Sequence, residues 1–213
     1  MRFLLGIDEA GRGPLAGPVA VGAVLVEEGY DILAAFPGLN DSKKLSEKKR
    51  DALHDLLMEE GKKGNLRSCV AYASESVIDR RGIAVAVKDA LTRAVRKLVP
   101  LETSVSSLAL TGHAPSVSNV HIYLDGSLKA PEGYVQETII GGDGTVPAIM
   151  LGALAAKVAR DRLMKKLAEE YPAYAFEVHK GYGTKLHYER LRLYGASPVH
   201  RKSFLKSLAL DAA

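Results

Sequence analysis

The sequence predicts an α/β fold, in which a β-sheet is flanked by helices. Short segments rich in strand-forming residues occur five times, at residues 3–7, 19–26, 66–73, 120–124 and 134–140. Three longer segments are predicted as helices, at residues 47–60, 83–98 and 147–170, and in the second of these the apolar residues recur at helical spacing. This mixture in a chain of 213 residues predicts one domain, with at most a small appendage.

The composition is that of an ordinary globular protein. Apolar residues make up 47% of the chain and charged residues 25%, which is enough to bury a real core. Cys69 is the only cysteine, which excludes an internal disulfide and a thiolate metal cluster and fits a reducing cytoplasm. The apolar run at the N-terminus is too short for a signal peptide, and the run of small apolar residues at 147–156 is too short to span a bilayer. We therefore expect a cytoplasmic, monomeric protein that is not bound to a membrane.

Capping residues, prolines and polar runs set the expected boundaries in the first half of the chain. Ser46 is a good N-cap for the first predicted helix, and Gly61 is expected to end it. Pro100 stops the amphipathic helix that precedes it. Residues 29–40 are expected to form a loop. Residues 101–119, rich in Ser and Thr and without periodicity, are expected to form a surface insertion.

The last 43 residues are predicted to be mainly helical. Residues 171–179 link the long helix to a further helix at 184–194, which Gly195 closes. Ser197 and Pro198 are expected to begin a last helix.

The stretch from Gly6 to Pro18 combines carboxylates, glycines and a cation. The first predicted strand runs into Asp8 and Glu9, and a segment rich in glycine and proline follows. Neighbouring side chains on a strand point to opposite faces, so these two carboxylates can serve one ion only if the strand ends or bends there. Glycine also lets the backbone approach a partner closely, and Arg12 adds a permanent positive charge. The stretch therefore predicts a site for a metal and a phosphate, although a solvated turn is the alternative for the acidic pair alone.

Four carboxylates follow three predicted strands: Asp8, Glu9, Asp125 and Asp143. At one edge of a sheet they would repel one another by a few kcal/mol per close pair, estimated roughly at a moderate dielectric, and such a cluster persists when cations hold it. The ligands are all hard oxygens, which favours Mg²⁺ or Mn²⁺ over zinc. Two such ions about 4 Å apart can stabilise both the attacking and the leaving oxygen of a phosphodiester.

The C-terminal segment carries most of the positive charge. From Lys180 onward there are seven basic residues and two acidic ones, whereas the net charge of the whole chain is +4. A basic segment on a nearly neutral body indicates a polyanionic partner. The alternative is a solvated helical face.

The motifs of this chain, taken in order, resemble those of the type 2 ribonucleases H, and of the bacterial ribonuclease HII branch in particular. The matching segments are Asp8-Glu9, Gly11-Arg12-Gly13, Asp41-Ser42-Lys43-Lys44-Leu45, Leu124-Asp125-Gly126, Gly142-Asp143, Ala156-Lys157-Val158-Ala159-Arg160-Asp161, Gly181-Tyr182-Gly183-Thr184-Lys185 and His200-Arg201-Lys202-Ser203-Phe204. The resemblance implies a ribonuclease H-like fold with a central mixed sheet, a catalytic core at residues 1–170, and a helical segment at 171–213 that closes over the nucleic acid. Only residues 101–119 look foreign to the family.

The resemblance also implies an activity and a set of site residues. The activity is metal-dependent endonucleolytic hydrolysis of the RNA strand of RNA–DNA hybrids, with cutting on the 5′ side of single ribonucleotides embedded in duplex DNA. It leaves 3′-hydroxyl and 5′-phosphate ends. The four carboxylates named above match the metal ligands. The residues expected to contact nucleic acid are Gly11, Arg12, Gly13, Lys43, Lys44, Lys157, Arg160, Tyr182, Lys185, Arg201 and Lys202. Among these, the Gly-Arg-Gly segment and Tyr182 are expected to read the junction between DNA and RNA.

Some of these residues allow other interpretations. Lys157 and Asp161 are four residues apart on a predicted helix and could form a surface ion pair. His187 and His200 could donate to phosphates but are more often ordinary polar contacts. The family usually has a serine where Ala153 stands, so one phosphate contact is expected to be missing.

Three other functions are alternatives to that of a ribonuclease HII. The sister branch, ribonuclease HIII, is expected to carry an extra N-terminal domain, whereas the first strand here begins near residue 3. A catalytically silent hybrid-binding protein would have lost one of the four carboxylates, and all are present. A purely structural role would leave the acidic strand ends without a cause.

Overall fold

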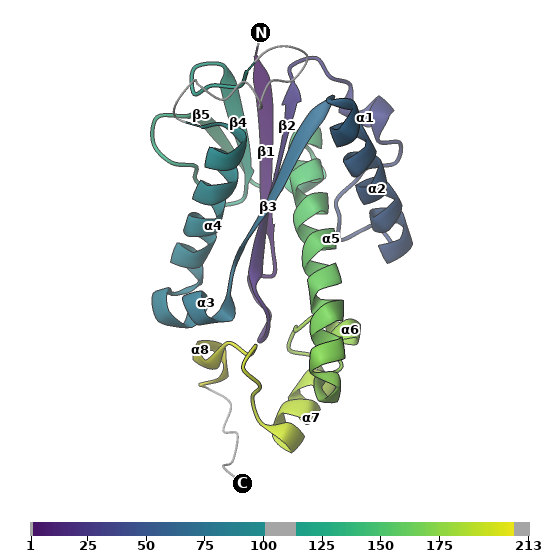
Figure 1. Ribbon diagram of the computed structural model, residues 1–213, viewed down its shortest axis with the longest axis vertical. Helices are drawn as coiled ribbons and strands as arrows, with labels where there is room; N and C mark the ends of the chain where they lie inside the picture. The colour runs from purple at the N-terminus through teal and green to yellow at the C-terminus, as the bar shows by residue number, and fades with distance from the viewer. Residues whose placement is uncertain (1, 101–113, 207–213) are drawn as a thin grey trace.

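The computed structural model describes residues 2–100 and 114–206, and its centre is a mixed five-stranded sheet (Figure 1). The strand order is β3-β2-β1-β4-β5. β1 is antiparallel to β2 and parallel to β4, so the carboxyl ends of β1 and β4 lie at the same edge of the sheet. The strands are β1 (Phe3–Ala10), β2 (Val19–Glu27), β3 (Leu66–Ala73), β4 (Val120–Asp125) and β5 (Val135–Ile139). The predicted α/β fold, with a central mixed sheet flanked by helices, is confirmed.

Helices cover both faces of the sheet and gather beyond one end of it (Figure 1). The α-helices are α1 (Ile32–Ala35), α2 (Glu47–Lys63), α3 (Glu75–Arg81), α4 (Ile83–Leu98), α5 (Pro147–Glu170), α6 (Phe176–His179), α7 (Lys185–Tyr194) and α8 (Lys202–Leu205). Two short 3₁₀ turns are η2 (Gly142–Gly144) and η3 (Pro172–Tyr174). In the part of the chain that the structure describes, no helix is long and apolar enough to cross a membrane.

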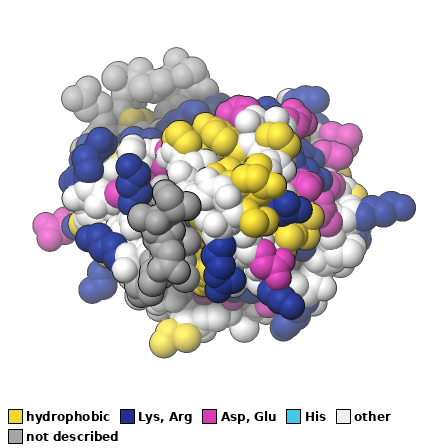
Figure 2. All heavy atoms as spheres, turned by 90° about the horizontal axis from the view of Figure 1, so that it is seen from below, with side chains coloured by type: hydrophobic (Ala, Val, Ile, Leu, Met, Phe, Trp, Pro, Cys, Tyr) yellow, Lys and Arg dark blue, Asp and Glu magenta, His cyan; other side chains and the backbone are white. Residues whose placement is uncertain are grey.

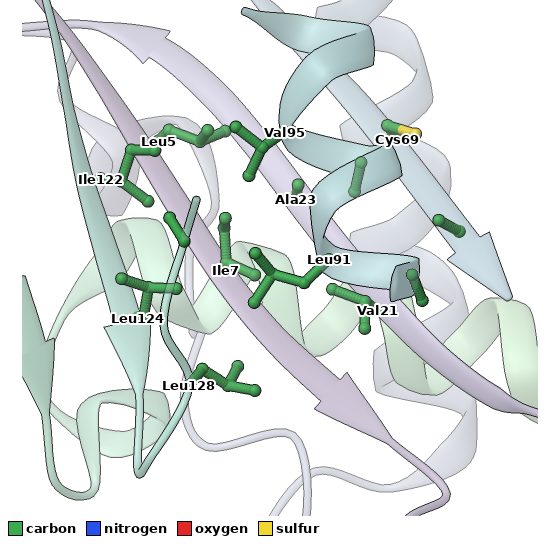
Figure 3. Packing of buried hydrophobic residues seen from close by; sticks show 14 of the residues in the cluster. Leu5, Ile7, Val21, Ala23, Cys69, Leu91, Val95, Ile122, Leu124 and Leu128 are labelled. Carbon is green, nitrogen blue, oxygen red and sulfur yellow. The ribbon is translucent and has the colours of Figure 1, made fainter. Parts of the chain in front are cut away.

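One face of the sheet packs against α4. Every second residue of the strands points to this side, because side chains alternate along a strand. Leu5 and Ile7 of β1 meet Leu91 and Val95 of α4, and all four are buried (Figure 3). The face of α4 that packs here is the apolar stripe that the sequence predicted for residues 83–98.

The other face packs against α5, and glycines let the helix backbone approach the strands closely. A Cβ added at Gly6 would lie 1.9 Å from the carbonyl oxygen of Ala148. A Cβ added at Gly22 would lie 2.2 Å from the carbonyl oxygen of Gly152. Backbone therefore meets backbone along this contact. The contact fixes how far α5 stands from β1, the strand that carries the acidic pair.

A third apolar cluster joins the C-terminal helices to the end of α5. Its buried members are Leu15, Ala16, Met164, Tyr174, Phe176, Leu191 and Leu205. Figure 2 looks onto the end of the molecule that carries α7 and α8 and shows hydrophobic side chains gathered in one area, with Lys and Arg distributed around it.

The described structure differs from the predicted elements at several boundaries. α1 lies inside the predicted loop at 29–40, and α3 was not predicted. α2 continues through Gly61 and ends at Gly64, which takes the left-handed conformation (φ +82°) and caps the helix. The last helix begins at Lys202, five residues later than expected. Residues 101–113 of the predicted insertion lie outside the described residues.

The late start of α8 has a physical cause. The backbone amides of Lys202 and Ser203 each donate to the carboxylate of Asp79, at 2.9 Å, and the Ser203 hydroxyl donates to it as well. A carboxylate from α3 therefore caps α8 across the fold. Such a partner, 123 residues away in sequence, cannot be recognised from local pattern.

We expect Gly22→Ala to destabilise the protein by about 1 to 3 kcal/mol or more, because the new Cβ would overlap backbone of α5 that cannot move independently of the sheet. Urea unfolding would measure the change. Gly61→Ala is the matched control, since a Cβ on that exposed helical position has its nearest neighbour at 3.8 Å. An equal effect of both substitutions would contradict close packing of α5.

Candidate active site

Three aspartates converge at the carboxyl edge of the sheet. Asp8 lies on β1, Asp125 is the last residue of the neighbouring parallel strand β4, and Asp143 lies in η2 just before α5. One carboxylate oxygen from each lies within 4.8 Å of the others. The backbone amide of Asp143 donates to Asp125 Oδ1 at 3.3 Å, which ties η2 to the strand end. The structure therefore brings together three of the four predicted metal ligands.

The electrostatics of this triad favour a bound cation. Burial, followed by the charge of Glu9, raises the pKa of Asp8 from 3.8 to about 8. Lys43 Nζ donates to Asp143 Oδ2 at 2.7 Å and supplies one positive charge to the cluster. That hydrogen bond also raises the pKa of the Lys43 ammonium. Three clustered carboxylates, one of them expensive to ionise without a cation, suit a hard divalent metal.

The fourth predicted ligand, Glu9, lies beside the triad. β1 continues to Ala10 and does not end at Asp8, yet Glu9 lines the same pocket as Asp8 and Asp125. Its carboxylate accepts a hydrogen bond from Arg12 Nη1 at 2.9 Å. Burial raises the pKa of Glu9, whereas the Arg12 guanidinium acts in the opposite direction. Its role as a metal ligand stays a prediction.

Two buried arginines support the glycine-rich loop beneath the site. Arg201 donates from three nitrogens to the carbonyls of Gly11, Arg12 and Gly17, at 2.7–2.9 Å. Arg160 donates to the carbonyls of Pro18, Ala16 and Lys180, at 2.9–3.2 Å. Arg160 is 1% exposed and Arg201 is 0% exposed. Both guanidinium groups donate to backbone carbonyls in this structure, so the expected contact of either group with phosphates stays a prediction.

The remaining predicted residues line the site or lie near it. A pocket of about 240 Å³ is lined by three of the four acidic residues, Asp8, Glu9 and Asp125, together with Gly11, Arg12, Gly13, Lys43, Ala153, Lys157 and Tyr182. Tyr182 is 42% exposed, so its ring is available to a ligand. Lys157 pairs with Asp161 at 2.8 Å, as the alternative interpretation allowed. Lys44, Lys185 and Lys202 are exposed outside this pocket.

The family model described as Ribonuclease HII matches residues 5–207 of the chain. A ribonuclease HII of Bacillus cereus is 42% identical over 204 residues, which are 96% of this chain and 69% of the relative. The chain belongs to the ribonuclease HII family.

Solved structures show the same fold. The ribonuclease HII in the PCNA:RNase HII complex from Archaeoglobus fulgidus has a TM-score of 0.74 and 21% identity, with 99% of this chain and 97% of that chain covered. Bst-RNase HIII in complex with Mn²⁺ has a TM-score of 0.59 and 16% identity, with 95% of this chain and 64% of that chain covered. The family match therefore favours ribonuclease HII over the sister branch that shares the fold.

Membership of the ribonuclease HII family fixes the general activity. The chain is a hydrolase, an endoribonuclease that acts on the RNA strand of RNA–DNA hybrids. The converging aspartates described above give this activity a place in the fold, at the carboxyl edge of β1 and β4.

Sequence reasoning did not find Arg50, which supports the lysine loop of the ribonuclease HII motif at residues 41–45. Its guanidinium donates to the carbonyls of Ser42, at 3.2 Å, and of Leu45, at 2.5 Å, and lies 3.7 Å from Asp161. Asp161 also pairs with Lys157, so one carboxylate links the lysine loop to α5. The sequence offers no signal for this role, because an arginine in the first turn of a helix usually faces solvent.

We expect Arg201→Lys to lower the free energy of unfolding by about 2 to 4 kcal/mol, because lysine keeps the charge but cannot reach three carbonyls and so leaves buried acceptors unpaired. Lys202→Ala should leave stability nearly unchanged and should flatten the slope of log affinity against log salt by up to about one unit. Urea unfolding and hybrid affinity at several salt concentrations measure the two effects. Unchanged stability of Arg201→Lys would show that the buried contacts are dispensable.

Proposed function

We propose that this enzyme, besides acting on RNA–DNA hybrids, cuts on the 5′ side of single ribonucleotides embedded in duplex DNA and leaves 3′-hydroxyl and 5′-phosphate ends. The observation that carries the proposal is the shared pocket, in which Gly11, Gly13 and the exposed Tyr182 lie together with Asp8, Glu9 and Asp125. A group that recognises a ribose and a group that cleaves beside it must lie within one nucleotide of each other. Such an activity would serve the removal of ribonucleotides from DNA during replication and repair.

The acidic residues are proposed to hold Mg²⁺ or Mn²⁺. Asp8, Asp125 and Asp143 provide the oxygen ligands, and Glu9 is the candidate fourth. When bound, the metal supplies activation of water and stabilisation of charge on the phosphodiester oxygens. The Mn²⁺ complex of the related RNase HIII supports a divalent ion of this kind. Lys43, which donates a hydrogen bond to Asp143, is proposed to contact a phosphate oxygen beside the metal ligands.

Recognition of the ribose is proposed to depend on close backbone approach. The 2′-hydroxyl distinguishes RNA from DNA and can both donate and accept a hydrogen bond. A Cβ added at Gly13 would meet nothing within 4 Å, so this position leaves open space for a ligand. Tyr182 offers a flat ring on which the adjoining deoxyribose or base can rest. Arg12, held by Glu9, adds a cation at the pocket rim.

The outer lysines are proposed to supply affinity that does not depend on sequence. Lys44, Lys185 and Lys202 are exposed and can reach the phosphates of a duplex that extends beyond the pocket. We further propose that the helical segment from residue 171 onward closes over the substrate, because Tyr182 and two of these lysines belong to it.

We expect Asp8→Asn to reduce cleavage by about 100-fold or more while hybrid binding persists, because the substitution keeps the shape but removes the charge of a metal ligand. A labelled duplex with one ribonucleotide, incubated with Mg²⁺, Mn²⁺ or EDTA, measures cleavage, and titration calorimetry with Mn²⁺ measures metal affinity. Full cleavage by Asp8→Asn in Mg²⁺ would remove Asp8 from the ligand set.

We expect Gly13→Ala to reduce cleavage at an embedded ribonucleotide by about tenfold, equal to about 1.4 kcal/mol, without loss of stability, because its Cβ would occupy the space left for the ribose. Gly11→Ala is a poor test, since a Cβ there would lie 1.9 Å from Arg160 Nε inside the protein, at a φ of +87°. Gly61→Ala on α2 serves as the control.

The companion substitution is at Tyr182. Tyr182→Ala should weaken cutting at the embedded ribonucleotide more than Tyr182→Phe does, because the ring and not the hydroxyl provides the stacking surface. Cleavage mapping beside an all-DNA duplex of the same sequence measures both effects. Cutting of the all-DNA duplex at a similar rate would overturn the proposed dependence on the 2′-hydroxyl.

A further inference from the structure

Three buried histidines lie behind Tyr182 and take no part in the function proposed above. His179 ends α6, His187 lies in α7, and His200 precedes α8; they are 6%, 0% and 1% exposed. The rings of His179 and His187 are stacked, with centroids 4.2 Å apart. His187 Nε2 lies 3.0 Å from His200 Nε2, so the two imidazoles share one hydrogen bond.

The neighbouring backbone groups determine where each proton sits. The backbone amide of Ser197 can only donate, and it lies 2.9 Å from His200 Nδ1, so Nδ1 of His200 is an acceptor. A neutral His200 then carries its proton on Nε2 and donates to His187 Nε2. His187 in turn carries its proton on Nδ1, which lies 2.9 Å from the carbonyl oxygen of Tyr182. Each of these three hydrogen bonds therefore has one donor and one acceptor.

The same argument gives His179 a separate role. The backbone amide of Gly181 donates to His179 Nδ1 at 3.2 Å, so the ring carries its proton on Nε2 and donates to the carbonyl of Tyr174 at 2.9 Å. The residues on both sides of the Tyr182 amide are therefore held by imidazoles. Leu15 completes the frame, because its amide donates to the carbonyl of Gly181 at 2.8 Å and ties this segment to the glycine-rich loop.

We propose that His187 and His200 are positioning residues that hold the Tyr182 backbone in place through a directed chain of hydrogen bonds, from the Ser197 amide through both imidazoles to the Tyr182 carbonyl. This inference rests on the proposed function, in which the Tyr182 ring supports the nucleotide beside the ribose. The chain of hydrogen bonds runs from the residues before α8 to the start of α7, so it ties Tyr182 to Ser197 and His200 and not merely to its sequence neighbours.

The neutral state of both rings agrees with this arrangement. Burial lowers the pKa of His187 and of His200 from 6.5 to about 4. A second proton on His187 would occupy Nε2 and face the Nε2–H group of His200, whereas a second proton on His200 would occupy Nδ1 and face the Ser197 amide, so either would break one hydrogen bond of the chain.

The proton positions can be tested without any substrate. In protein labelled with ¹⁵N at histidine, long-range ¹H–¹⁵N correlation spectra near pH 7.5 should show the Nδ1–H tautomer for His187 and the Nε2–H tautomer for His200. His200→Asn, which keeps an acceptor for Ser197 but loses the donor to His187, should change the His187 spectrum more than His200→Gln does. The opposite tautomer on either ring, or a charged ring, would overturn the proposal.

The effect on recognition is tested by a matched pair at one position. His187→Asn places an amide donor near the Nδ1 position and should preserve much of the contact to Tyr182, whereas His187→Gln places its amide near Nε2 and should not. Under single-turnover conditions, His187→Gln should lower the ratio of embedded-ribonucleotide to hybrid cleavage by about fivefold to tenfold, the loss expected for one hydrogen bond, with partial rescue in His187→Asn.

A double substitution separates this inference from the proposed function. If the histidines act through Tyr182, His187→Gln should have little further effect on that ratio in the Tyr182→Ala background. A ratio lowered by Tyr182→Ala but not by His187→Gln would overturn the role of the histidines and leave the proposed function standing. A ratio that Tyr182→Ala itself does not change would overturn the proposed reading of the junction, and the tautomers would still report on the chain of hydrogen bonds.

Discussion

The loop between β1 and β2 depends on two buried guanidinium groups. The carbonyls of Gly11, Arg12, Ala16, Gly17 and Pro18 all accept hydrogen bonds from these groups, and most of these bonds are buried. Arg160 comes from α5 and Arg201 from the segment before α8, so the loop is complete only when the C-terminal part of the chain has packed. An unpaired buried carbonyl costs about 1 to 3 kcal/mol, and five of them would exceed much of the stability of a domain of this size. Packing of the C-terminal segment and the conformation of this loop are therefore coupled.

The long helix α5 transmits this coupling to the metal site. It begins at Pro147, shortly after the turn that holds Asp143, and it packs on the glycines of β1 and β2 with backbone against backbone. Lys157 and Arg160 lie near its middle. A shift of α5 along the sheet would displace η2 and the loop beneath the site together. Because these glycines have no side chains, the backbone of α5 contacts the backbone of the strands directly, and no intervening layer of side chains lets the helix slide. The position of the aspartate triad therefore follows from the packing of α5 against β1.

Much of the fold and the acidic centre could be predicted from sequence because the signals are local. Strand composition, the Ser46 cap and the period of residues 83–98 each report on a few neighbouring residues, and the structure places β3 and α4 at the predicted bounds. The errors have the opposite character. The start of α8 is decided by Asp79, and the burial of Arg201 by carbonyls about 190 residues earlier. The sequence of a basic segment does not distinguish a residue that binds phosphate from one that is buried against backbone carbonyls.

Burial separates two arginines from most of the other predicted nucleic-acid contacts, and Arg12 stays exposed with the lysines. The arginines 160 and 201 lie inside, whereas lysines 43, 44, 185 and 202 lie outside. The planar guanidinium carries five donors and is weakly hydrated, so it can enter the interior and satisfy three carbonyls at once. The ammonium group is a compact, strongly hydrated charge on a flexible stem, which suits a phosphate backbone whose position varies. On the function proposed here, affinity and its salt dependence would be properties of the exposed lysines and Arg12, whereas discrimination at the ribose would depend on the frame that the buried arginines and histidines maintain. The two can be altered independently, because no side chain belongs to both sets.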